Sequence, residues 1–188
     1  MPLTCATFSR DSLPLLGTFN CAKDNDDVFG QLATDWIKCA DPEKNAITSI
    51  ETLGTRVFLY IHTDDSGKEA VAGFGSLGTH TRTIKGKEEL WSIIPHLGVD
   101  VGFRKYPPGE WYDCYSAQIV LNLMYMAEQL LTPTLHLLVH PDNIGARKLY
   151  DRLGFERFGN ITPGGYMRMK VELPLSANFH EGFVSYIE

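Results

Sequence analysis

The stretch Leu135–Phe155, LHLLVHPDNIGARKLYDRLGF, constrains the fold of this chain more than any other part of the sequence. Its first residues form a short apolar run that predicts a buried strand, and the proline that follows ends this run. Asp142 or Asn143 then supplies an oxygen that can cap the first turn of a helix. Gly154 provides the left-handed turn that ends the helix. The stretch therefore predicts a strand, a tight turn, a helix over 143–153 and a second strand in direct succession.

One face of this expected helix is a candidate binding surface. Asn143 and Tyr150 are seven residues apart, so they lie on nearly the same face. Ala146 lies between them and leaves space for a thin ligand to approach. The amides of the first helical turn have no partner within the helix, so they can face a polar ligand.

The rest of the chain alternates between helical and extended patterns. Helical spacing of apolar residues predicts an amphipathic helix over 24–39 and a well-buried helix over 115–131. Runs rich in β-branched and aromatic residues predict strands over 56–63, 70–77, 90–101, 134–139, 155–158 and 166–173. The first two of these strands flank a polar turn, which predicts a hairpin. The order of elements predicts an α/β (α+β) fold, in which a mixed sheet has helices on both faces.

Composition limits the kinds of protein that this chain can be. Its 188 residues carry a formal net charge of -6, and no run of Lys and Arg offers the basic face with which proteins grip nucleic acid. The four cysteines lack Cys-x-x-Cys spacing, so we expect free thiols and no metal site. The first residues do not read as a signal peptide, and no apolar run approaches the ~20 residues that span a bilayer. We therefore expect a cytoplasmic protein without a membrane segment, for which nucleic acid is a disfavoured partner.

The stretch 135–155 resembles the C-terminal signature of the GNAT superfamily of acetyltransferases. The signature reads V-x-P-x-N-x-x-A-x-x-x-Y-x-x-x-G-F, and the matching residues here are Val139, Pro141, Asn143, Ala146, Tyr150, Gly154 and Phe155. Two further segments, VAGFGSL at 71–77 and LGVDVGFR at 97–104, are similar to the central strand of the family and to the strand before its pyrophosphate loop. The resemblance implies a GNAT fold with a twisted, mostly antiparallel sheet. It also implies one domain over 1–188, with a core at about 19–173 and a tail at 174–188, and acetyl-CoA as co-substrate with no metal.

The N-terminal part of the chain resembles one subgroup of this family. Phe19, Cys21, Asp26, Asp27 and Phe29 are similar to a pattern at the first helix of that subgroup, some of whose members are toxins that acetylate tRNA. This resemblance implies an alternative function, the acetylation of aminoacyl-tRNA. The net charge of -6 disfavours it.

The expected pyrophosphate loop departs from the family pattern. The usual R/Q-x-x-G-x-G/A lets backbone amides reach the phosphates at the start of a helix. Here Arg104 leads into KYPPGEWYDCYSAQ, which is several residues longer, retains only Gly109 and has two prolines that remove amide donors. One alternative is a loop that still holds coenzyme A, with charge added by Arg104 or Lys105. The other is a GNAT-fold binding protein that has lost catalysis.

The chemistry of acetyl transfer assigns roles to particular residues. The thioester carbonyl must be polarised, the amine deprotonated and the leaving thiolate protonated. The resemblance implies that the amides of Gly98 and Val99 polarise the carbonyl and that Tyr150 is the general acid. Glu89 and His96 flank the strand beside the expected acceptor site and are the candidate bases, with an ordered water as the alternative. The candidate cofactor-binding residues are Gly98, Val99, Val101, Arg104, Tyr115, Ser116, Asn143, Ala146 and Tyr150.

The acceptor is the least constrained part of the hypothesis. We expect an amine-bearing small molecule or peptide. Aromatic residues cluster within 103–115 and could line an acceptor pocket or pack a dimer contact. Pairing of two copies into a homodimer, through edge strands or the aromatic segment 176–188, stays open.

Overall fold

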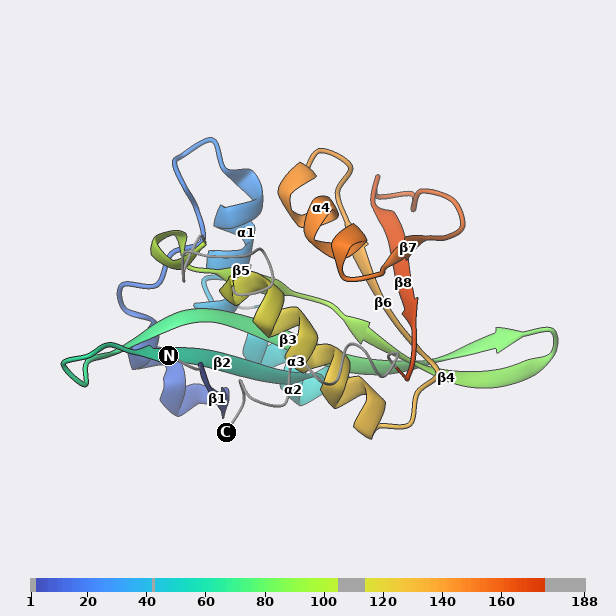
Figure 1. Ribbon diagram of the computed structural model, residues 1–188, viewed down its shortest axis with the longest axis horizontal. Helices are drawn as coiled ribbons and strands as arrows, with labels where there is room; N and C mark the ends of the chain where they lie inside the picture. The colour runs from blue at the N-terminus through green and yellow to red at the C-terminus, as the bar shows by residue number, and fades with distance from the viewer. Residues whose placement is uncertain (1–2, 42, 105–113, 175–188) are drawn as a thin grey trace.

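A single sheet runs through the molecule and carries helices on both faces (Figure 1). The computed structural model describes residues 3–41, 43–104 and 114–174. The strands are β1 (Thr4–Thr7), β2 (Arg56–Thr63), β3 (Glu69–Ile84), β4 (Lys87–Ile94), β5 (Leu97–Val99), β6 (Thr134–Val139), β7 (Glu156–Arg157) and β8 (Met167–Glu172). The helices are α1 (Val28–Ile37), α2 (Ala46–Leu53), α3 (Tyr115–Gln129) and α4 (Ile144–Arg152), with 3-10 turns η1 (Arg10–Leu16) and η2 (Val101–Phe103).

One parallel pair at the centre divides the sheet into two antiparallel parts. The strand order is β1-β2-β3-β4-β6-β8-β7, and β5 follows β4 along the same side of β3. β4 and β6 run parallel over Ser92–Ile94 and Leu135–Leu137. The other described pairs are antiparallel. The expected mixed, mostly antiparallel sheet is confirmed.

The helices on the two faces of the sheet enclose two separate cores. Side chains of β2 alternate between the faces, as a pleated strand requires. Val57 and Leu59 pack in the core that holds α1 and α2, whereas Phe58 and Tyr60 pack in the core that holds α3 and α4. Figure 1 shows α3 lying across one face, with α4 near β6 and β8. The prediction of helices on both faces is therefore confirmed.

The buried helix α3 packs closely on β3, because two glycines of that strand leave room for it. A Cβ atom on Gly73 would lie 2.5 Å from Ile119 Cδ1, and one on Gly75 would lie 2.7 Å from Leu123 Cδ1. The polar residue Asn122 is buried in this contact and accepts a 2.7 Å hydrogen bond from the Tyr60 hydroxyl. This close packing fixes the start of α3 beside β5.

A β-bulge separates β4 from β5. β3 pairs with β4 at Gly78–Ile93 and with β5 at Gly75–Leu97. Between these pairs β3 has two residues, Ser76 and Leu77, while the other strand has three, 94–96. The sequence predicts one strand over 90–101, but Pro95 cannot donate to a ladder and lies at the bulge. Beyond the bulge β5 pairs with β3 and not with β6, so a gap opens between β5 and β6.

The structure adds elements that the sequence patterns do not predict. β1 and η1 precede Phe19, the expected start of the core, and Phe8 and Leu16 from this region are buried. α2 also lacks a predicted counterpart, although its ends carry ordinary signals. Asn45 caps it by accepting a 2.9 Å hydrogen bond from the Thr48 amide, and Gly54 ends it at φ 62°.

Candidate functional site

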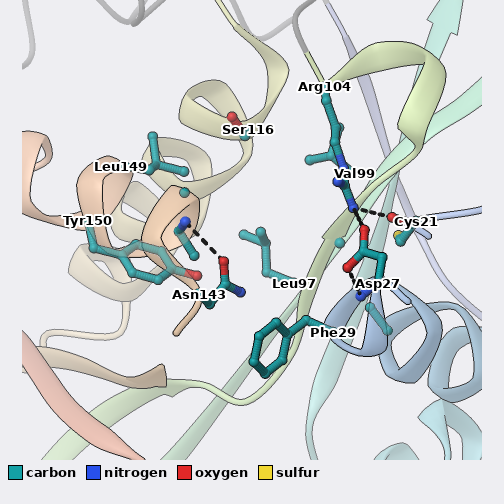
Figure 2. Close-up of a pocket in the computed structure, with 15 residues that line it drawn as sticks. Cys21, Asp27, Phe29, Leu97, Val99, Arg104, Ser116, Asn143, Leu149 and Tyr150 are labelled. Carbon is teal, nitrogen blue, oxygen red and sulfur yellow. Dashed lines mark hydrogen bonds and ion pairs between the residues drawn. The ribbon is translucent and has the colours of Figure 1, made fainter. Parts of the chain in front are cut away.

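A pocket of about 350 Å³ lies beside β5, between α1 and α4 (Figure 2). Its walls come from five places in the fold, namely the segment before α1 with α1 itself, β5, Arg104 at the end of η2, the start of α3, and α4. The described lining residues are Cys21, Asp27, Phe29, Gly30, Ala33, Leu97, Gly98, Val99, Arg104, Ser116, Asn143, Gly145, Ala146, Leu149 and Tyr150. Seven of the nine candidate cofactor-binding residues are thus brought together: Gly98, Val99, Arg104, Ser116, Asn143, Ala146 and Tyr150.

The α4 wall is built as its sequence predicts. Asn143, rather than Asp142, caps the helix, because its side-chain oxygen accepts a 3.2 Å hydrogen bond from the Ala146 amide. Gly154 adopts φ 83°, and the Phe155 amide donates to the Tyr150 carbonyl at 2.9 Å. A Cβ added at Gly145 would meet no atom within 4 Å, so this wall is open beside Ala146.

Tyr150 contributes a protonated phenol to the same wall. Its side chain is buried, with 7% of the residue exposed, and its ring packs on Phe155 at a centroid distance of 5.7 Å. Burial raises the pKa of Tyr150 to about 12, so the hydroxyl keeps its proton throughout the physiological range. Figure 2 shows Tyr150 and Asn143 on the side of the pocket opposite Arg104 and Asp27.

The β5 wall presents backbone amides toward the gap. Along two antiparallel strands, residues that lie opposite each other form backbone hydrogen bonds at every second position. The Ser76 amide donates to the His96 carbonyl and the Asp100 amide to the Ala72 carbonyl, each at 2.9 Å. The alternation then directs the Gly98 amide toward Phe74 on β3, and it directs the amides of Leu97 and Val99 away from β3, toward the gap.

Gly98 is glycine for a steric reason. A Cβ at this position would lie 2.5 Å from the Phe74 ring and 2.7 Å from the Cys21 sulfur. Both neighbours are buried. The absence of a side chain thus lets β5 lie flat between β3 and the segment before α1.

An ion pair closes the end of the pocket opposite α4. Arg104 Nη2 donates to Asp27 Oδ2 at 3.0 Å and also to the Cys21 carbonyl oxygen. Burial alone would raise the pKa of Asp27, but hydrogen bonds from the Lys23 and Gly30 amides and from Arg104 lower it below its ordinary value. Asp27 is therefore ionised at neutral pH.

Two candidate cofactor-binding residues lie outside the pocket lining. The Val101 amide donates to the Asn20 carbonyl at 2.8 Å, which ties η2 to the segment before α1. Tyr115 begins α3 but is fully buried, and its hydroxyl and His62 Nδ1 lie 2.7 Å apart in a hydrogen bond. The expected loop residues 105–113, with Lys105 and Gly109, fall outside the described residues.

The two candidate bases lie in different surroundings. Glu89 is on β4 opposite Arg82, in the hairpin with β3, where it accepts a 3.2 Å hydrogen bond from Trp91 Nε1 and does not line the pocket. His96 lies in the bulge, directly before the lining residue Leu97. Its ring centroid lies 4.0 Å from that of Trp36 in a stacked contact. The residue as a whole is exposed, but desolvation of the stacked ring lowers the pKa of His96 to about 4. The imidazole is therefore neutral at pH 7.

Several lining residues have no role in the sequence-based hypothesis. Cys21, Asp27 and Phe29 come from the segment that carries the second resemblance, and this was the signal that could have pointed to them. The ring centroids of Phe29 and His140 lie 5.1 Å apart, so this contact joins α1 to the turn after β6. Burial raises the pKa of Cys21 to about 12, so its thiol stays protonated and unreactive.

In the part of the chain that the structure describes, no group of three or more His, Cys, Asp or Glu side chains could hold a metal ion. Among the same residues, no helix has the length and apolarity to cross a bilayer.

The bulge between β4 and β5, the gap between β5 and β6, and α3 and α4 on one face are the arrangement of the GNAT fold. The structure is similar to that of a mutant AtaT toxin bound to the C-terminus of the antitoxin AtaR and acetyl-CoA, with a TM-score of 0.66 at 13% identity over 98% of this chain and 99% of that one. It is also similar to an acetyltransferase from Bacillus subtilis in complex with CoA, with a TM-score of 0.56 at 17% identity over 92% of this chain and 99% of that one. A GNAT-family acetyltransferase from Staphylococcus aureus Mu50 is similar as well, with a TM-score of 0.57 at 14% identity over 92% of this chain and 99% of that one.

Sequence comparison alone does not find these proteins. No family model matches the chain, and no curated protein matches it. The structural likenesses show that the chain has the GNAT fold expected from its sequence resemblance. The proteins that share this fold include a toxin and other acetyltransferases.

Proposed function

We propose that this protein is an acetyl-CoA-dependent N-acetyltransferase. The observation that carries the proposal is the pocket beside the free side of β5, which has backbone amides of β5 on one wall and Tyr150 of α4 on another. A thioester in this gap would have hydrogen-bond donors on one side and a proton source on the opposite side. The proposal includes one catalytic domain over 1–188 and a cytoplasmic location, in keeping with the free thiols of the cysteines.

The β5 amides would polarise the thioester carbonyl. Charge develops on that oxygen as the amine attacks, and donors that are already in place stabilise it without reorganisation. Val99, with its amide toward the gap, is better placed for this role than Gly98, whose amide points to β3. Leu97 offers a second amide of the same orientation.

Tyr150 would donate its proton to the departing thiolate. The hydroxyl remains protonated at neutral pH, because burial raises its pKa. Asn143 holds the first turn of α4, so it sets the position of the whole wall on which Tyr150 lies.

The residues present fit the cofactor at two further points. Gly145 and Ala146 leave the α4 wall open to a narrow chain. Ser116 lines the pocket at the first turn of the 15-residue helix α3, whose amide dipoles favour negative charge. We propose that this turn, with Arg104, faces the phosphates, while Val101 and Tyr115 support the site from outside the lining.

The acceptor would be an amine of a small molecule or a peptide. His96 is the candidate base closer to the pocket, since Leu97 beside it lines the pocket and Glu89 does not. Its lowered pKa makes it a weak base, so we propose that the amine loses its proton through ordered water, with His96 as a hydrogen-bond acceptor in that path.

Calorimetric titration of the purified protein with acetyl-CoA tests the proposal, followed by a thiol-release assay with a panel of primary amines. We expect micromolar binding and amine-dependent release of coenzyme A. Failure of acetyl-CoA to bind would favour the alternative of a non-catalytic GNAT-fold binding protein.

A second candidate function is a toxin-type acetyltransferase that acts on aminoacyl-tRNA. It is favoured by the likeness to the AtaT toxin over 98% of this chain and by the resemblance at Phe19–Phe29. Induced expression in bacteria should then arrest growth, and the Tyr150→Phe variant should relieve the arrest. Harmless expression of the wild-type protein would contradict this candidate.

A further inference from the structure

Contacts between two chain segments hold one end of the pocket together. The Asn20 amide donates to Asp100 Oδ2 at 2.7 Å, and the Val101 amide donates to the Asn20 carbonyl at 2.8 Å. Arg104 adds the contacts to Asp27 and to the Cys21 carbonyl. Both Arg104 contacts use Nη2, so one nitrogen of the guanidinium is held by the segment before α1.

Asp27 is fixed independently of Arg104. Its Oδ1 accepts from the Gly30 amide at 2.9 Å, as the cap of α1, and its Oδ2 accepts from the Lys23 amide at 3.0 Å. Gly30 packs so tightly that a Cβ there would lie 2.4 Å from the Cys21 carbonyl oxygen. The carboxylate therefore keeps its place in the pocket wall whether or not the guanidinium stays beside it.

This pair supplies the charges of the described pocket lining. Among the described lining residues Arg104 carries the one positive charge and Asp27 the one negative charge, and they lie 3.0 Å apart. The described lining therefore has no net charge. Coenzyme A, however, brings a pyrophosphate and a further phosphate. A carboxylate beside the guanidinium both occupies it and repels these groups.

We propose that Asp27 competes with the cofactor phosphates for Arg104, and that it thereby limits the affinity for coenzyme A and speeds its release after each turnover. This inference rests on the proposed function and adds a role for a residue outside the transfer chemistry. Asp27 is a specificity-determining residue in this account, because its effect falls on ligands that carry phosphate.

The size of the effect follows from solvent exposure. The side chains of Arg104 and Asp27 are 40% and 19% exposed, so water and salt screen their charges. We expect removal of the Asp27 charge to tighten coenzyme A binding about threefold to fivefold at low ionic strength. The gain should shrink as salt is raised.

The test compares three variants with the wild-type protein. Asp27→Asn removes the charge but keeps an oxygen that can cap α1, and Asp27→Ser is a second neutral cap in case the first does not fold. Asp26→Asn is the matched control, because Asp26 is an exposed carboxylate one residue away that does not line the pocket. Each protein is titrated with coenzyme A and with pantetheine, which lacks phosphate, at about 50 and about 300 mM salt.

We expect Asp27→Asn to bind coenzyme A at least threefold more tightly than both the wild-type protein and Asp26→Asn. All four proteins should bind pantetheine with equal affinity. In turnover, the same variant should have a lower KM for acetyl-CoA and a lower kcat, because product release slows.

Unchanged or weaker coenzyme A binding by Asp27→Asn would overturn this inference and leave the proposed function standing. An equal gain for pantetheine would also overturn it, since the effect would not depend on phosphate. Absence of coenzyme A binding by all four proteins would instead overturn the proposed function, and this inference with it.

Discussion

Tyr150 shows how one buried side chain can be tied to both the core and the pocket. Its ring packs on Phe155, while it also lines the pocket opposite β5. The same burial that makes it part of the core keeps its hydroxyl protonated. The residue therefore has a structural role and a proposed catalytic role, and the two can be separated by removing the oxygen alone.

Tyr150→Phe should lower kcat about a hundredfold and leave the KM for acetyl-CoA unchanged, because the ring packing stays and the proton donor is lost. Steady-state kinetics with a reactive amine measures both constants, and thermal melting checks that the fold is intact. Full turnover by this variant would remove Tyr150 from the mechanism.

Gly98→Ala should destabilise the protein by about 1–3 kcal/mol, because the new methyl group meets the Phe74 ring at 2.5 Å and the Cys21 sulfur at 2.7 Å. Gly145→Ala is the matched control, since nothing lies within 4 Å of its Cβ and alanine favours a helix. Urea denaturation compares the two free energies of unfolding. Equal stability of both variants would contradict the close packing of β5.

At the scale of elements, the Ser76 side chain adds hydrogen bonds to the backbone bond that spans the bulge between β4 and β5. Ser76 Oγ accepts a 2.9 Å hydrogen bond from the His96 amide and lies 2.9 Å from the His96 carbonyl oxygen. These contacts fix the extra residue that turns β5 away from β6. The gap thus depends on a serine that does not line it.

Ser76→Ala should cost about 1–2 kcal/mol of stability and weaken acetyl-CoA binding, because the His96 amide loses its partner and the bulge loosens. Ser92→Ala provides the comparison. The buried Ser92 hydroxyl lies 2.8 Å from Thr132 Oγ1, where β4 runs beside β6. We therefore expect this variant to lose a similar amount of stability and to bind acetyl-CoA unchanged. Equal binding by both variants would show that the bulge does not set the pocket.

The sequence predicts elements whose signals are local and misses those that depend on distant partners. Asn143 and Gly154 mark the ends of α4 within one short stretch, so that helix could be predicted together with its face. The Arg104–Asp27 pair joins residues 77 positions apart, and no pattern along the chain announces it. The division of 90–101 into two strands could be predicted only in part, because Pro95 marks the break in the sequence but no pattern along the chain shows that Ser76 bonds to His96.

At the scale of the whole molecule, a half-buried histidine, His136, couples stability to pH. Burial, together with His80, Arg82 and Arg168 nearby, lowers the pKa of His136 to about 4. Its Nδ1 is buried and has no hydrogen-bond partner among the described residues. The unfolded chain, with an ordinary histidine pKa near 6.5, binds the proton more readily than the folded one. Stability from this group is therefore full above about pH 6.5 and is lost as pH falls toward 4.

The urea midpoint of the wild-type protein should fall between pH 7 and pH 4.5, and His136→Gln should flatten part of this fall. The remaining slope belongs to other groups, among them His96, whose pKa is also lowered by desolvation. Parallel denaturation curves at both pH values measure the difference. An identical slope in the variant would show that His136 is not responsible.

Among the described residues, no strand pairs with the side of β5 that faces away from β3, so this side is a free strand edge inside the sheet. Free edges expose unpaired backbone groups that can recruit other chains. A ligand held along this edge would satisfy those groups, and ligand binding to the folded state alone raises stability in proportion to the logarithm of ligand concentration. If this ligand is acetyl-CoA, as proposed above, the amount of folded protein in a cell would rise and fall with the supply of acetyl-CoA, and the lifetime of the chain would respond to metabolism.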